Sequence, residues 1–229
     1  MVVITGASDG IGKQIALRLA KEGTRLALVA RNEKNLNEVC EEAQKLGVKD
    51  VKAYSCDIRQ TGKLKEVAEK ILSDFGNVDV LINGAGVWQK LDPLEKISEE
   101  TVDEVIQTNL MALIHLTRLL LPNLKSRPES AIINISSKSG VVAQEGQAIY
   151  TASKYGVRGF TEVLEVDLKN TPVRVAGVYQ SGTNTKMFEK AGDTLPLEKF
   201  TSPSDLADVI AYMLSLPKKI WLYEVRVKY

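Results

Sequence analysis

The fold of this 229-residue chain is decided by the stretch Thr5-Gly6-Ala7-Ser8-Asp9-Gly10-Ile11-Gly12, which lies between a short apolar run and an amphipathic segment. Glycines let a backbone turn sharply and approach a bound group closely, and a helix N-terminus offers free N–H groups with partial positive charge. A strand, a glycine loop and a helix in this order predict a cradle for the phosphates of a nucleotide. The alternative is an ordinary strand-to-helix turn, which three glycines within seven residues disfavour.

Short aliphatic runs alternate with amphipathic stretches along the rest of the chain. The runs show little polar alternation, as strands buried on both faces of a parallel sheet do. The expected strands are Val2–Thr5, Leu26–Ala30, Val51–Tyr54, Val78–Asn83, Ala131–Ser136, Val173–Tyr179 and Ile220–Val227, the last being more mixed and expected at a sheet edge. The expected helices are Ile11–Glu22, Glu33–Leu46, Thr61–Phe75, Glu99–Leu121, Ala148–Lys169 and Ser204–Leu216, with Gly23, Gly47 and Gly76 as C-terminal caps.

Seven strands alternating with six helices predict an α/β fold of the Rossmann type. We expect residues 1–229 to form a single doubly wound domain, with a seven-stranded, mostly parallel sheet flanked by helices. The longest irregular piece is Gln180–Phe200, and loops of that length are usually functional or mobile.

Composition excludes several classes of protein. Hydrophobic residues make up 44% of the chain, charged residues make up 26%, and the net charge is +1, so no global field favours nucleic acid or an anionic membrane. The two cysteines, Cys40 and Cys56, have no metal-ligand spacing, so no metal site is expected. No stretch offers the roughly 18 apolar residues of a membrane span, and no basic segment of a signal peptide is present. We therefore expect a soluble, cytoplasmic protein.

The end of the second expected strand bears on the choice of cofactor. Sites for NAD usually place an acid there to bind the ribose 2′-hydroxyl, but this chain has Ala30 followed by Arg31. An arginine can hold a 2′-phosphate through two hydrogen bonds. Arg31, with Ser8 nearby in the glycine loop, therefore favours NADP(H), the alternative being a solvated surface arginine. Asp57, after the third strand, could accept a hydrogen bond from an adenine amino group or cap the next helix.

A possible catalytic group lies further along the chain. Tyr150 and Lys154 are four residues apart at the start of an expected helix, so they share one face. A neighbouring ammonium favours the phenolate and should lower the pKa of the tyrosine, which would make it a usable proton donor and acceptor. Ser137 follows the fifth strand, and α/β sheets place ligands at such strand ends. Asn109 lies in an otherwise apolar helix, where a buried amide needs hydrogen-bond partners, and a merely structural role is its alternative.

Together these segments resemble the short-chain dehydrogenase/reductase family over essentially the whole chain. The resemblance is carried by Thr5–Gly12, Asn83-Gly84-Ala85-Gly86, Asn109, Ser137 and Tyr150-Thr151-Ala152-Ser153-Lys154. It implies that Tyr150 exchanges a proton with the reacting oxygen and that Ser137 hydrogen-bonds that oxygen. It also implies that Lys154 binds the nicotinamide ribose and that Asn109 holds a water in a proton relay.

The resemblance also implies a set of residues that contact the cofactor. They are Gly6, Ser8, Gly10, Ile11, Gly12, Arg31, Asp57, Ile58, Asn83, Ala85, Gly86, Tyr150, Lys154 and Thr185. The chain departs from the family at Gly84, where Asn or Ser is usual, and at Gln180-Ser181-Gly182, where the family has Pro-Gly. The missing proline leaves φ unfixed at that point.

The function expected from these residues is the NADP(H)-dependent reduction of a carbonyl to an alcohol, or the reverse, with NADP(H) preferred over NAD(H). One alternative is a reductase of 3-ketoacyl thioesters, and an alternative of another class is a non-catalytic dinucleotide sensor or scaffold. Trp88 could line the substrate mouth or serve only in packing. The family also implies a homodimer or homotetramer, paired through Glu99–Leu121 and Ala148–Lys169.

Overall fold

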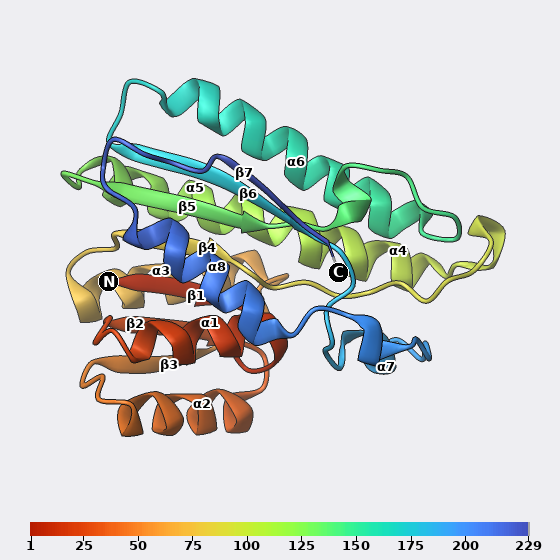
Figure 1. Ribbon diagram of the computed structural model, residues 1–229, viewed down its shortest axis with the longest axis horizontal. Helices are drawn as coiled ribbons and strands as arrows, with labels where there is room; N and C mark the ends of the chain where they lie inside the picture. The colour runs from red at the N-terminus through yellow and green to blue at the C-terminus, as the bar shows by residue number, and fades with distance from the viewer. Residues whose placement is uncertain (229) are drawn as a thin grey trace.

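Seven parallel strands form one sheet, in the order β3-β2-β1-β4-β5-β6-β7 (Figure 1). The structure is a computed structural model that describes residues 1–228. Its strands are β1 (Val2–Thr5), β2 (Leu26–Ala30), β3 (Val51–Ser55), β4 (Val80–Asn83), β5 (Ser130–Ile135), β6 (Val173–Gln180) and β7 (Glu224–Val227). The predicted fold class is confirmed, and the sheet is parallel throughout.

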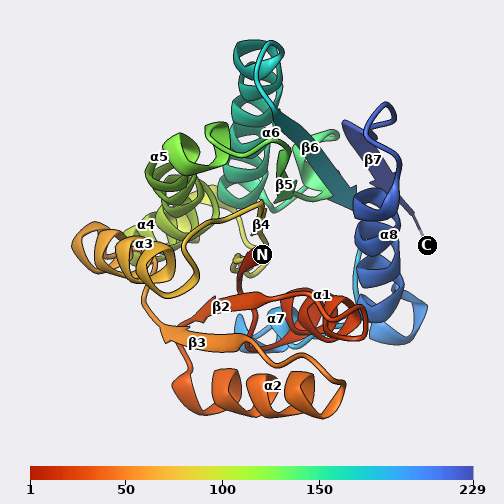
Figure 2. The same ribbon diagram turned by 90° about the vertical axis from the view of Figure 1, so that its left-hand side faces the viewer.

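Helices cover both faces of this sheet, as the end-on view in Figure 2 shows. They are α1 (Gly10–Ala20), α2 (Glu33–Lys45), α3 (Thr61–Phe75), α4 (Glu99–Ile106), α5 (Ala112–Lys125), α6 (Ala148–Leu168), α7 (Met187–Lys190) and α8 (Pro203–Ser215). Apolar side chains of α1, α2 and α8 pack on one face, and those of α3, α5 and α6 pack on the other. The central strands are therefore buried on both sides, which is why their sequences are continuously aliphatic.

The edges of the sheet differ from its centre in composition. β7 was predicted as an edge strand and is one, with no fully buried residue. It begins at Glu224 rather than at Ile220, because the preceding segment is occupied in packing: the Trp221 indole N–H donates to the carbonyl oxygen of Val175 at 2.7 Å.

Gly23, Gly47 and Gly76 have positive φ just after their helices, as the prediction of C-terminal caps requires.

One predicted helix is interrupted. The stretch Glu99–Leu121 is not a regular α-helix, because a π-helical segment, Gln107–Met111, separates α4 from α5. Helical structure also continues beyond the expected end, through Pro122 to Lys125. The bulge contains Asn109, and π-bulges are frequent at functional sites. The predicted irregular stretch Gln180–Phe200 contains the short helix α7 and a 3₁₀ turn, Leu197–Lys199.

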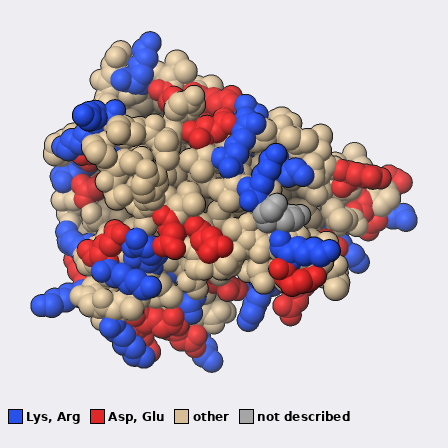
Figure 3. Space-filling view, viewed as in Figure 1, with Lys and Arg blue, Asp and Glu red and all other residues tan. Residues whose placement is uncertain are grey.

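The continuous helical stretch Glu99–Lys125 is long and apolar enough to cross a membrane by length and composition, with 44% of its most apolar window buried. A single stretch of this kind is weak grounds for a membrane span, because the core helix of a soluble protein passes the same test. Leu116, Leu120 and Leu124 of this stretch are buried against the sheet. On the face shown in Figure 3, acidic and basic side chains are interspersed.

Candidate active site

A cavity of about 760 Å³ lies at the carboxyl ends of the strands, beside α7. Its walls come from the glycine loop, the end of β2, the turn after β3, the loop after β4 and the segment that includes α7. This is the crevice where open α/β sheets bind ligands. Among the predicted cofactor contacts, the residues that line it are Gly6, Ser8, Gly10, Ile11, Gly12, Arg31, Asp57, Ile58, Ala85, Gly86 and Thr185.

The glycine loop is closely packed against its surroundings. Gly6 has a φ of +72°, and a Cβ atom there would lie 2.8 Å from the Cα of Ala85. A Cβ atom at Gly12 would collide with the carbonyl oxygen of Gly6, so no larger residue fits at the start of α1. The Thr5 hydroxyl accepts hydrogen bonds from the N–H groups of Gly84 and Ala85, at 3.1 Å each, which joins this loop to the one after β4. The residues present therefore form a narrow backbone cradle that fits a pyrophosphate.

Asp9 places a negative charge in this cradle, and a lysine neutralises it. Its carboxylate caps α1 by accepting the Gly10 N–H at 2.8 Å and pairs with Lys190 of α7 at 2.8 Å. Burial raises the pKa of Asp9, but the hydrogen bonds from Lys190 and Gly10 outweigh it and leave the pKa below its ordinary value. The pair also ties α7 to the start of α1.

The end of β2 offers a cation to the cavity. Arg31 lines the cavity together with Ser8, and its side chain is half exposed. Its Nη1 lies 3.4 Å from a carboxylate oxygen of Glu104, which is a long contact and a weak restraint. NAD sites usually carry an acid at the end of this strand, and in this chain the last residue of β2 is Ala30. This arrangement fits a 2′-phosphate.

Two of the expected cofactor contacts, Asp57 and Asn83, have side-chain partners within the protein. Asp57 does not cap α3, whose N-cap is Gln60. It pairs with Arg59 at 2.7 Å instead, while still lining the cavity. Asn83 does not line the cavity. Its amide donates to Asn134 at 2.8 Å and to Thr117 at 3.1 Å, so it joins β4 to β5 and α5 inside the core.

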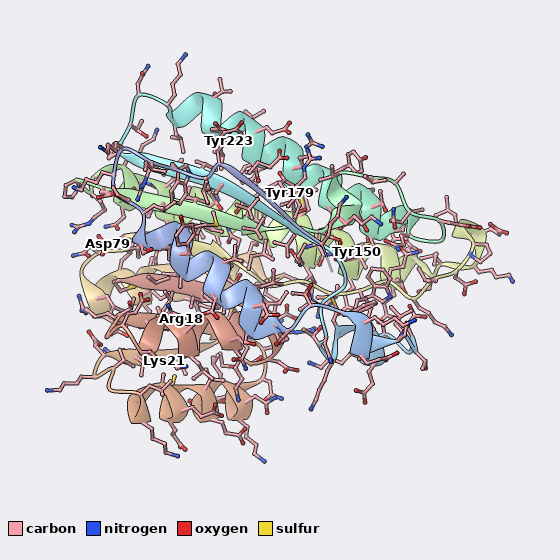
Figure 4. All side chains as sticks on the ribbon, viewed as in Figure 1. Arg18, Lys21, Asp79, Tyr150, Tyr179 and Tyr223 are labelled. Carbon is pink, nitrogen blue, oxygen red and sulfur yellow. The ribbon has the colours of Figure 1, made fainter. Side chains whose placement is uncertain are left out.

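Tyr150, Ser137 and Lys154 come together beside the cavity: Ser137 hydrogen-bonds Tyr150, and Lys154 lies behind Gly86, which lines the cavity. Tyr150 is labelled in Figure 4. The Lys154 ammonium lies 5.6 Å from the centre of the Tyr150 ring and donates to the carbonyl oxygen of Ile135 at 3.3 Å. A Cβ atom at Gly86 would lie 3.6 Å from this ammonium, and Gly86 itself lines the cavity. The backbone of Gly86 therefore lies between the Lys154 ammonium and the cavity. Tyr150 and Lys154 are each 4% exposed.

Burial dominates the protonation equilibria of this group. Burial raises the pKa of Tyr150 to about 12, against the lowering effect of a hydrogen bond with Ser137. Burial also lowers the pKa of Lys154 to about 8. The pKa of Tyr150 is therefore raised in this structure, whereas the nearby ammonium was expected to lower it. The sequence could not predict this, because it does not show how completely the ring is buried.

Asn109 is held in the π-helical segment by bonds to the loop after β4. Its amide donates to the carbonyl oxygen of Val87 at 3.0 Å and to the Ser153 hydroxyl at 3.2 Å, and its side-chain oxygen accepts the Val87 N–H at 2.8 Å. The side chain thus positions the loop that carries Gly86.

The backbone is also hydrogen-bonded at Gln180-Ser181-Gly182, where the family usually has Pro-Gly. The Ser181 N–H donates to the carbonyl oxygen of Val227 at 2.9 Å.

Sequence reasoning missed Gln89. This side chain is 1% exposed, and its oxygen accepts the N–H groups of Ile149 at 3.0 Å and Tyr150 at 2.9 Å. Its amide donates to the carbonyl oxygen of Gly146 at 3.2 Å. Gln89 therefore caps the first turn of α6, where the N-cap residue Gln147 provides no side-chain bond. A cap contributed from another element is not visible in the sequence near α6.

Within residues 1–228, no cluster of three or more His, Cys, Asp or Glu side chains is arranged to hold a metal ion.

Comparison with known proteins agrees with this architecture. The family model described as short chain dehydrogenase matches residues 1–196. A 3-oxoacyl-(acyl-carrier-protein) reductase of Thermotoga maritima is 34% identical, over 93% of this chain and 89% of its own. Among solved structures, an alcohol dehydrogenase from Thermococcus sibiricus, complexed with 5-hydroxy-NADP, superposes with a TM-score of 0.89. It has 28% identity and covers 98% of this chain and 94% of its own. A metagenomic short-chain oxidoreductase in complex with NADP has a TM-score of 0.87 and 31% identity, covering 100% and 96% of the two chains.

A Rossmann-type sheet with a glycine-loop cavity and a Tyr–Ser–Lys group beside it, together with these matches, identifies an oxidoreductase. The chain belongs to the short-chain dehydrogenase/reductase family, whose matched members here act on CH–OH or C=O groups and include proteins solved with NADP.

Proposed function

We propose that this protein reduces a carbonyl compound to an alcohol, or runs the reverse reaction, with NADP(H) as cofactor. The observation that carries the proposal is the position of Lys154 directly behind Gly86 and of Tyr150 against Trp88. Gly86 and Trp88 both line the cavity that the glycine loop and Arg31 also form. A carbonyl carbon near Gly86 would therefore lie beside a proton donor and beside the cofactor site at once.

The bound nicotinamide group supplies or accepts the hydride in this chemistry. Tyr150 then donates a proton to the oxygen that develops negative charge, or takes it back in oxidation. Ser137 hydrogen-bonds the same oxygen, since its hydroxyl already pairs with Tyr150. Lys154 holds the ribose hydroxyls and, when charged, favours the phenolate of Tyr150. Asn109 holds the Val87 backbone in place and, through a water, connects Lys154 to solvent.

The preference for NADP(H) over NAD(H) rests on Arg31. A guanidinium after the end of β2, with Ser8 also lining the cavity, matches a 2′-phosphate, and its contact with Glu104 is long at 3.4 Å. NADP or NADPH is also the cofactor named for the solved relatives above and for an actinorhodin polyketide ketoreductase.

A second candidate substrate is a 3-ketoacyl thioester. The Thermotoga maritima relative and one from Staphylococcus epidermidis, 33% identical over 93% of this chain, are both named 3-oxoacyl-(acyl-carrier-protein) reductases. A reductase of this kind would use the same Tyr150 chemistry on a longer substrate. A sensor that binds the dinucleotide without catalysis would have no need of the buried tyrosine and lysine.

We further propose that residues 1–229 form one domain and that the protein works as a soluble cytoplasmic homo-oligomer. One sheet carries all seven strands, and both cysteines are unpaired and buried. The side chains of Val163 and Val166 on α6 are 59% and 64% exposed, and this apolar surface would be covered if α6 packed against a second copy of the chain. Sedimentation at micromolar concentration should show a species of at least twice 25.2 kDa, and a monomer alone would contradict the oligomer.

The test of the function is NADPH consumption by the purified protein over aldehydes, simple ketones, 3-ketoesters and 3-ketoacyl thioesters. Turnover of any class supports the reductase, and the highest kcat/KM identifies the substrate class. NADPH binding without turnover of any compound would contradict the reductase and favour the sensor.

A further inference from the structure

The indole of Trp88 covers the tyrosine of the site. The two rings are 4.6 Å apart between centroids, at an interplanar angle of 62°, which is an edge-to-face contact. Tyr150 is only 4% exposed, and it does not line the cavity, whereas Trp88 does. The indole therefore lies between the cavity and the Tyr150 ring.

Trp88 is held in this position by the segment that follows α7. Its indole N–H donates to a carboxylate oxygen of Asp193 at 2.6 Å, and the same carboxylate accepts the Leu91 N–H at 3.3 Å. Phe188 packs edge-to-face on the indole at 5.1 Å, and Phe200 packs on Phe188 at 5.7 Å. One polar bond and the contact with Phe188, itself backed by Phe200, thus hold the indole over the tyrosine.

We infer that Trp88 determines substrate specificity, and that Asp193 sets its position. The inference rests on the proposed function, because it concerns the carbonyl compound that reaches Tyr150. A substrate must place its carbonyl oxygen at the Tyr150 hydroxyl, so one of its substituents must lie against the indole. Trp88 gives the cavity an aromatic surface at this point, with Phe188 packed behind it, and the Asp193 carboxylate already bonds the indole. A charged substituent held against the indole would lose hydration on that side, and the ring offers it no hydrogen bond in return.

The substrate class that follows is a carbonyl compound with a compact, apolar group next to the carbonyl. Shortening Trp88 should admit larger groups, because the volume of the indole would become available to the substrate. The relevant quantity is the ratio of kcat/KM for a bulky ketone to that for a small one. This ratio does not depend on how much of the preparation is folded.

The experiment compares wild type, Trp88→Phe and Trp88→Ala with 2-butanone and propiophenone as substrates and NADPH as cofactor. We expect the bulky-to-small ratio to rise by about tenfold or more in Trp88→Ala and by less in Trp88→Phe, with the Kd for NADPH unchanged. Trp221→Phe is the matched control, since Trp221 is the other tryptophan of the chain and packs under Arg174, outside the cavity. Its ratio should equal that of wild type.

Two results separate the possible failures. A wild type that turns over ketones, with the same ratio in Trp88→Ala, would overturn this inference and leave the proposed function standing. A wild type that binds NADPH but reduces no ketone, aldehyde or thioester would overturn both.

The role of Asp193 is tested by fluorescence in the Trp221→Phe background, where Trp88 is the sole tryptophan. Asp193→Ala should raise acrylamide quenching of Trp88 and shift the substrate ratio in the direction of Trp88→Ala. Unchanged quenching would overturn the assignment of Asp193, whatever the activity of the protein.

Discussion

The side-chain oxygen of Gln89 accepts the backbone N–H of Tyr150 at 2.9 Å, across 61 residues of sequence. The same oxygen accepts the N–H of Ile149, so it binds two of the free donors at the start of α6. Trp88, the neighbour of Gln89 in sequence, lies on the Tyr150 ring. The loop after β4 therefore holds the tyrosine through its backbone and its ring together.

Gln89→Leu should lower kcat by about tenfold and leave the Kd for NADPH unchanged. Two buried N–H groups would lose their acceptor, which costs about 1–3 kcal/mol, and the first turn of α6 would shift with Tyr150 on it. Steady-state kinetics and a cofactor titration measure the two effects separately.

Gln89→Glu should recover part of this loss, because a carboxylate keeps an acceptor for both N–H groups while losing the donor to Gly146. Gln144→Leu is the control, since Gln144 is half-buried and its amide donates to the neighbouring carbonyl of Ala143, away from the start of α6. Equal kcat in Gln89→Leu and wild type would show that Gln89 does not position the tyrosine.

Tyr150→Phe should lower kcat by roughly 10²- to 10⁴-fold, the usual range for the loss of a general acid. Its Kd for NADPH should stay close to that of wild type, because the cavity is lined without the Tyr150 hydroxyl. Single-turnover rates and fluorescence titration with NADPH measure the two quantities. Turnover at the wild-type rate would exclude Tyr150 as the proton donor.

Arg31→Ala should weaken NADPH binding by roughly 10- to 100-fold, since charge-assisted hydrogen bonds to the 2′-phosphate are lost. The Kd for NADH should change little, so the preference between the cofactors should narrow or invert. Arg18→Ala provides the control, because Arg18 pairs with Glu22 and Asp208 outside the cavity and is labelled on α1 in Figure 4. An unchanged Kd for NADPH in Arg31→Ala would contradict the NADP(H) assignment.

Lys154→Met should make the protein more stable at pH 7 while removing its activity. The folded pKa of Lys154 is about 8 against an ordinary value of 10.5, so below pH 8 the folded state carries a buried charge that the unfolded chain carries in water. The gain should be about 3 kcal/mol in the free energy of unfolding.

This gain should shrink as the pH rises from 8 to 10.5, because the unfolded state then binds more protons than the folded state and the stability of wild type increases. Urea unfolding of both proteins without added cofactor, at pH 7 and pH 10, measures the difference. A gain that is the same at both pH values would show that the lysine is not destabilised by its burial.

Much of the fold was predictable because the signals for it are local. The continuous aliphatic runs of β1, β2 and β5 reflect burial on both faces of a sheet, and Gly6 and Gly12 are glycines because their backbone contacts leave no room for a Cβ atom. The π-helical segment around Asn109 was missed, since its period differs from that of an α-helix over only a few residues.

The order of strands and helices and the glycine loop could therefore be read from local sequence, as could the residue types of the candidate catalytic group. The tertiary structure decided how these residues are held. It buried Tyr150 beneath Trp88 and so raised its pKa, assigned Gln89 as the cap of α6, paired Asp57 with Arg59 and withdrew Asn83 from the cavity. These outcomes depend on contacts between elements distant in sequence, and the burial of a charge or a phenol is a property of all its neighbours together.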